Sequence, residues 1–127
     1  MMLSLLIGSK LMQDSATLWI KVDPVYATNI LGDSPTRLCR ESPTEYWQYS
    51  IEMNEEKSSL ELLAAYIKSK LDLLKPLRKN YRTGVNLTLI EDFIGDRYYF
   101  NSEEMAVFSE LNVEIAITRK SCPAANQ

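Results

Sequence analysis

The stretch SATLWIKVDP, Ser15 to Pro24, decides the fold of this 127-residue chain. Its residues alternate between an apolar set, Ala16, Leu18, Ile20 and Val22, and a second set that contains Trp19. This period of two is typical of a strand with one buried face, so Trp19 falls on the outer face. Asp23 and Pro24 then predict a helix start, because a proline in the first helical position loses no hydrogen bond.

The helix that begins at Pro24 ends in the stretch LGDSPTR, Leu31 to Arg37. Gly32 supplies the left-handed residue that terminates helices, and Pro35 prevents the helix from continuing. A short strand is expected over residues 36–40. A phosphate-binding loop follows a strand and opens a helix, whereas this stretch follows a helix and contains one glycine. We therefore interpret it as a turn, with an anion site at Thr36 and Arg37 as the alternative.

Further strands and helices are predicted downstream. Trp47, Tyr49, Ile51 and Met53 alternate with Tyr46 and Gln48, which predicts a strand over 46–53. Ser58 and Glu61 have the spacing of a capping box at the start of a long helix, which Pro76 should kink. The remaining predictions are strands over 85–91, 97–100 and 113–118, and a helix that begins after Asn101, with Glu104 completing its cap.

This order predicts an α+β fold, a ferredoxin-like sandwich in which helices cover one face of a mainly antiparallel sheet, with an extra C-terminal helix and strand. Residues 15–119 form the single domain. Residues 1–14 are expected to be an N-terminal extension or edge hairpin, and residues 120–127 a flexible tail. The outer residues Trp19, Tyr46 and Gln48 are expected on the open side of the sheet.

Composition indicates a globular protein, with 46% hydrophobic and 24% charged residues. The net charge of −3 disfavours binding to nucleic acid, which requires clustered Lys and Arg. Acids dominate residues 41–61 and 91–114, and bases dominate residues 68–82. No stretch approaches the roughly 20 apolar residues that cross a bilayer, and no signal peptide is recognised. With two cysteines, Cys39 and Cys122, a reducing cytoplasm and no membrane association are predicted.

The chain contains no histidine. This removes the commonest general base and the commonest ligand for transition metals, and it excludes a Ser-His-Asp or Cys-His mechanism. Neighbouring carboxylates such as Glu55 and Glu56 lack the spacing of a metal-binding loop. We therefore predict that the protein is not an enzyme and that it uses no cofactor and no metal.

Binding is the favoured function. Trp and Tyr are enriched at protein interfaces because they bury a large area at low entropic cost, and acidic patches steer association with basic partners. The predicted contact residues are Trp19, Tyr46, Glu52, Glu55 and Glu56. Two alternatives are a small-ligand or enzymatic pocket near Thr36 and Arg37, and a structural homodimer formed through the open sheet face.

Several segments together resemble a widespread bacterial family of small domains of unknown function. These segments are SATLWIKVDP, ILGDSPTR, YWQYSI, LDLLKPLRK, LTLI and NSEEMAVFSELNVEIAI. The family is marked by a Leu-Gly-x-x-Pro-Thr step after the first helix and a Trp at the start of a strand. The resemblance covers about Ser15 to Thr118, and Met1 to Asp14 depart from it. It implies an α+β fold and a bacterial cytoplasmic setting but no catalytic residues. By analogy, such small acidic proteins resemble immunity proteins, which neutralise a toxin, for instance a basic nuclease, by binding it.

Overall fold

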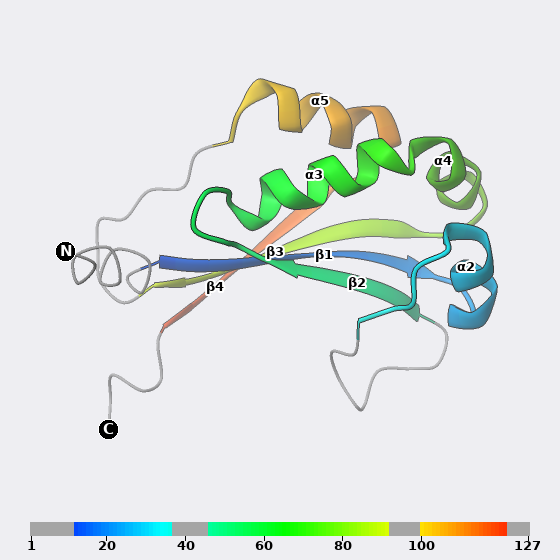
Figure 1. Ribbon diagram of the computed structural model, residues 1–127, viewed down its shortest axis with the longest axis horizontal. Helices are drawn as coiled ribbons and strands as arrows, with labels where there is room; N and C mark the ends of the chain where they lie inside the picture. Colours follow the sequence, from blue (N-terminus) through cyan, green and yellow to red (C-terminus); the bar gives the residue numbers. More distant parts are fainter. Residues whose placement is uncertain (1–11, 37–45, 92–99, 122–127) are drawn as a thin grey trace.

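The computed structural model describes residues 12–36, 46–91 and 100–121. Within them, one open sheet in the strand order β2-β1-β3-β4 supports a layer of helices (Figure 1). The strands are β1 (Met12–Lys21), β2 (Tyr46–Glu52), β3 (Thr83–Glu91) and β4 (Ile115–Ser121). The helices are α2 (Pro24–Leu31), α3 (Ser59–Ser69), α4 (Leu71–Asn80) and α5 (Ser102–Leu111).

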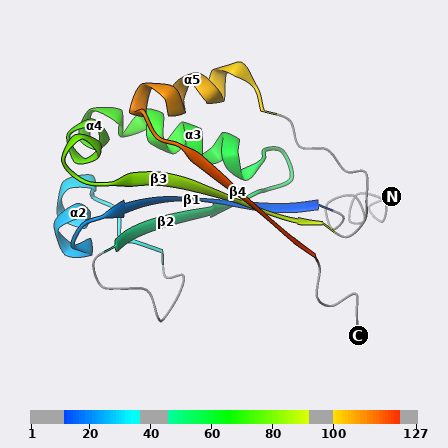
Figure 2. The same ribbon diagram turned by 180° about the vertical axis from the view of Figure 1, so that it is seen from behind.

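The sheet is mixed and mostly antiparallel. The central strand β1 is antiparallel to both β2 and β3, with Trp19 opposite Gln48 on one side and opposite Gly84 on the other. The edge strand β4 is parallel to β3, and α5 provides the crossover between them. The predicted α+β class, with helices packed on one face of a mainly antiparallel sheet, is confirmed (Figures 1 and 2).

The buried face of the sheet carries the residues that alternation predicted. Ala16, Leu18 and Ile20 of β1 are fully buried, and so is Trp47 of β2. The helices cover this face with a second set of apolar residues: Ala27, Leu31, Leu60, Leu63, Ala64, Ile67, Leu74, Leu77, Phe108 and Leu111. Burial of such side chains from both layers is the main source of stability.

The helix ends follow the capping signals in the sequence. Asp23 caps α2 by accepting the Val25 N–H at 3.2 Å, and Gly32 ends it at φ 79°. Ser58 and Glu61 form the complete capping box of α3. Asn101 caps α5 by accepting the Glu104 N–H at 2.8 Å. These predictions are confirmed, because capping depends on residues close together in the chain.

The long helix differs from the prediction. It breaks into α3 and α4 at Lys70, and Pro76 lies inside α4 rather than at the break. At the break, the N–H of Lys70 donates to the carbonyls of Tyr66 and Ile67, and its side chain turns toward α2 to donate to the Leu31 carbonyl at 2.7 Å. A tertiary contact therefore accompanies the change of direction, which occurs well before the proline.

Some boundaries also differ from the sequence expectations. Strand β1 begins at Met12, so the last residues of the expected N-terminal extension join the sheet. The possible hairpin within residues 1–11, most of the strand at 36–40 and residues 97–99 lie outside the described residues, as do Arg37, Cys39 and Cys122. Helices long and apolar enough to traverse a bilayer are absent from the described residues.

Candidate functional site

The two predicted outer aromatic residues lie side by side on the sheet face opposite the helices. The ring centroids of Trp19 and Tyr46 are 5.8 Å apart, with the ring planes tilted by 59°. Trp19 comes from the central strand β1 and Tyr46 from β2, where Lys21 and Tyr46 are cross-strand partners. Rings at such a distance interact favourably beyond the area that they bury.

Gly84 determines how Trp19 lies. A Cβ atom built on Gly84 would be 2.5 Å from Cζ2 of Trp19, so the indole ring rests directly on the glycine backbone of β3. Aromatic side chains cover strand glycines in this way when the two residues are cross-strand neighbours. The sequence analysis missed this partnership, because it requires the β1–β3 register that sets Trp19 opposite Gly84.

The rest of this sheet face is mostly polar, and the exposed Lys21 lies opposite Tyr46. Thr17 and Ser50 share a hydrogen bond of 2.6 Å between their hydroxyl oxygens across the β1–β2 pair. No described helix packs on this face, which we call the open face (Figures 1 and 2). Its members are Ser15, Thr17, Trp19, Lys21, Tyr46, Gln48, Ser50, Glu52, Gly84, Asn86, Thr88, Ala116 and Thr118.

The predicted acidic contact residues lie at the other end of β2 and in the turn after it. Glu52 is exposed and pairs in register with Ser15, so it continues the open face. Glu55 and Glu56 are exposed in the following turn, where the side-chain oxygen of Asn54 accepts the N–H of Glu56 at 2.8 Å. At about 3.4 Å per residue along a strand, Tyr46 and Glu52 are roughly 20 Å apart. The aromatic pair and the acids thus occupy opposite ends of one face.

The stretch that contains the alternative anion site is tied into the fold at Asp33. The carbonyl of Asp33 accepts the indole N–H of Trp47 at 3.2 Å, and its carboxylate accepts the Tyr66 hydroxyl at 2.8 Å. The ammonium group of Lys70 lies 3.4 Å from the same carboxylate oxygen. Burial raises the pKa of Tyr66 far above its ordinary value, and the Asp33 carboxylate raises it further, so this hydroxyl stays protonated and donates.

Thr36 is also used for structure. Its hydroxyl accepts the N–H of Ser50 at 2.7 Å, and its own N–H donates to the Gln48 carbonyl at 3.0 Å. These bonds attach residue 36 to the outer edge of β2, where the sequence predicted the start of a strand. The N–H of Thr36 is therefore already used, and its hydroxyl proton can be donated to the same Gln48 carbonyl, 3.5 Å away.

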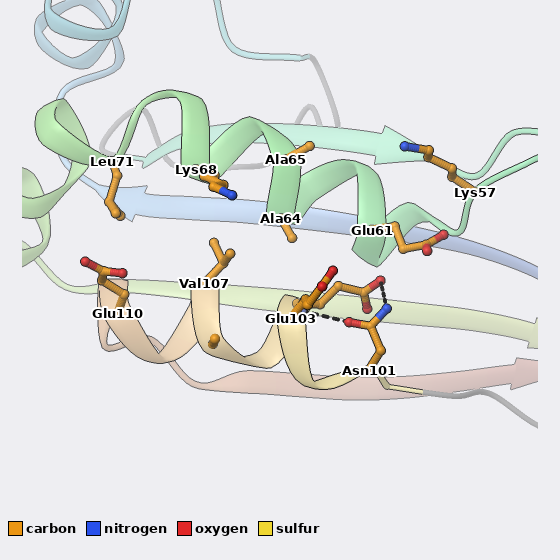
Figure 3. A pocket seen from close by; sticks show the side chains of 12 residues that line it. Lys57, Glu61, Ala64, Ala65, Lys68, Leu71, Asn101, Glu103, Val107 and Glu110 are labelled. Atoms are coloured by element: carbon orange, nitrogen blue, oxygen red, sulfur yellow. Dashed lines mark hydrogen bonds between the residues drawn. The ribbon is translucent and has the colours of Figure 1, made fainter.

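A groove of about 590 Å³ separates α3 from α5 (Figure 3). Its apolar lining residues, Ala64 on α3 and Val107 on α5, face each other, and Glu61 and Asn101 lie at one end (Figure 3). Glu104 is 8% exposed and accepts the side-chain N–H of Asn101 at 3.0 Å. Glu61 and Glu104, three residues after the N-caps of α3 and α5, interact across the groove, which the sequence did not reveal.

Loss of water around Glu104 raises the pKa of its carboxyl group, and the nearby Glu61 carboxylate raises it further. A pKa above the unfolded-state value means that the folded protein binds this proton more tightly. The contribution of Glu104 to stability therefore becomes more favourable as the pH falls from neutral through its folded-state pKa, and this gain is complete below the unfolded value near 4.5.

We expect Glu104→Gln to stabilise the protein at pH 7 and to flatten this pH dependence, because the amide is neutral and can still accept from Asn101. Urea denaturation at several pH values between 4 and 8 measures the effect. The neighbouring exposed residue provides the control, Glu103→Gln, which should leave the slope unchanged. A Glu104→Gln protein that is less stable at pH 7 would show that the charged carboxylate is favourable in the fold.

No group of three or more Cys, Asp or Glu side chains with a metal-binding arrangement occurs among the described residues. Comparisons of the chain with models of known protein families, with curated proteins and with solved structures find no match. The resemblance to a bacterial family accordingly stays a prediction.

Proposed function

We propose that this protein is a non-catalytic binding module that docks a basic protein partner on its open face. The observation that carries the proposal is the Trp19–Tyr46 pair, two large amphipathic rings in contact on a sheet face that no described helix covers. Such residues dominate the binding energy of protein interfaces.

The acidic residues at the far end of the face support a basic partner. Glu52, Glu55 and Glu56 are exposed, and none of them takes part in either ion pair found in the described part of the chain. Their charge is therefore available to steer and orient a cationic surface. The separation of about 20 Å between the two ends fits within a standard interface of roughly 800 Å² per partner.

An immunity-like role is a specific form of this proposal. In this form, the open face would bind and block a basic bacterial toxin. The family resemblance implies the bacterial cytoplasmic setting. A homodimer through the same face is the second candidate, since two copies could bury the aromatic pair against each other. Sedimentation of the purified protein separates the two, because the homodimer account requires a concentration-dependent dimer without any other protein.

The test compares two open-face variants with a control on the helical side. We expect a double variant, Trp19→Ser with Tyr46→Ser, and a charge-reversed variant, Glu52→Lys with Glu55→Lys and Glu56→Lys, each to weaken partner binding at least about tenfold. Glu110→Lys, an exposed change on α5, should leave binding unchanged.

In a pull-down from the host, the partner is a basic protein that the wild type and Glu110→Lys both retain in stoichiometric amount. Its affinity for each variant is then measured with purified components. The proposal is contradicted if the retained protein binds the open-face variants as tightly as the wild type. Absence of any stoichiometric partner across several growth conditions of the host would also count against it.

A further inference from the structure

A second cavity, of about 380 Å³, is lined by residues at the starts of β3 and β4 and near the end of α4. Trp19 forms part of its wall, and Arg78, Arg82, Asn86, Asn112 and Glu114 contribute the polar groups. Its volume falls at the lower end of the range for small-molecule sites. None of the predicted partner residues except Trp19 lines it.

The charge of this cavity is opposite to that of the whole chain. Two guanidinium groups line it against one carboxylate, Glu114, while the net charge of the protein is −3. Arg82 is exposed just before β3, and its backbone is anchored because its carbonyl accepts the N–H of Lys21 at 2.9 Å. Guanidinium groups bind carboxylates and phosphates in a planar, paired geometry. The cavity is therefore suited to an anionic group.

Arg78 is held in place before any ligand arrives. Its Nε donates to the carbonyl of Asn112 at 2.7 Å, and Asn112 ends α5 in the left-handed conformation at φ 62°. This bond uses one of the five N–H donors of the guanidinium group. A preorganised cation binds an anion with less loss of conformational entropy than a freely moving one.

The Trp19 ring supplies the second element of recognition. Because Gly84 lets the indole lie on the backbone of β3, the ring is a flat, fixed wall beside the arginines. Planar rings stack favourably on such a surface. A ligand with a planar ring and an anionic group would contact both the indole ring of Trp19 and the two arginines.

We propose that this cavity binds a small planar anion, with its ring against Trp19 and its phosphate or carboxylate against Arg82 and Arg78. This inference shares Trp19 with the proposed partner surface but adds Arg78 and Arg82, which are not assigned to the partner, so Arg82→Gln tests it separately.

Titration calorimetry with two probes tests it and separates the two anions. Adenosine monophosphate represents a ring with a phosphate, and benzoate a ring with a carboxylate; adenosine and benzamide are their neutral counterparts. We expect saturable binding of at least one anion below about 10 mM, and binding at least tenfold weaker for its neutral counterpart.

Matched variants locate the site. Arg82→Gln should weaken binding of that anion at least about tenfold, and Trp19→Leu should also weaken it, whereas Lys79→Gln, an exposed change on α4 outside the cavity, should not. The inference is overturned if neither anion binds, if the neutral counterparts bind equally well, or if Arg82→Gln has no effect. An equal loss in Lys79→Gln would also overturn it, because it would indicate diffuse charge attraction.

Discussion

Replacing Trp47 with alanine should lower the free energy of unfolding by about 3–5 kcal/mol, because it removes the largest side chain of the core and leaves a cavity. Trp47 has no exposed surface, its indole N–H donates to the Asp33 carbonyl at 3.2 Å, and its ring stacks on Tyr49 at 5.8 Å. Since a domain of this size is stable by only about 5–15 kcal/mol, the variant should be near the limit of folding. Urea denaturation followed by circular dichroism measures the change.

The other tryptophan serves as the control for this prediction. Trp19→Ala lies on the open face and should cost much less stability, because the side chain leaves no enclosed cavity. If Trp47→Ala cost less than about 1 kcal/mol, Trp47 would not be the core anchor that its burial indicates.

Replacing Asp33 with alanine should cost about 2 kcal/mol, mainly because the half-buried Tyr66 hydroxyl loses its charged acceptor at 2.8 Å. The ion pair with Lys70 adds little, because the two side chains are 28% and 34% exposed and water screens their attraction. Glu55→Ala, a change of an exposed carboxylate in a turn, should alter stability by less than about 0.5 kcal/mol and is the control.

A double-mutant cycle with Tyr66→Phe isolates the bond between the two side chains. The double variant should be more stable than the sum of the single losses implies, since each single change removes the same hydrogen bond. Strict additivity of the two losses would mean that the Asp33–Tyr66 hydrogen bond does not stabilise the fold.

Much of the secondary structure could be predicted because its signals are local. Alternation placed Ala16, Leu18 and Ile20 in the core and Trp19 outside, and the caps at Asp23, Ser58 and Asn101 marked three helix starts. The break at Lys70 could not be predicted, because the Lys70 side chain binds the Leu31 carbonyl, a contact between distant parts of the chain.

The same distinction applies to the candidate sites. Alternation was sufficient to place Trp19 and Tyr46 on one face, but the support of Trp19 by Gly84 depends on strand register. Likewise, Tyr66 donates its hydroxyl hydrogen to Asp33 across 33 positions of sequence. Local signals did not reveal this bond, so the sequence suggested only a turn at Leu31 to Arg37, with an anion site as the alternative. The meeting of Glu61 and Glu104 requires the packing of α3 on α5.

Site-specific photocrosslinking in the host tests the central claim, that the open face is the binding surface, most directly. A photoreactive amino acid would replace Gln48, which lies opposite Trp19 on the open face, or Ala106, an exposed residue of α5 on the helical side. The account predicts a single covalent adduct with a basic protein from position 48 and none from position 106. An adduct from position 106 alone would contradict it.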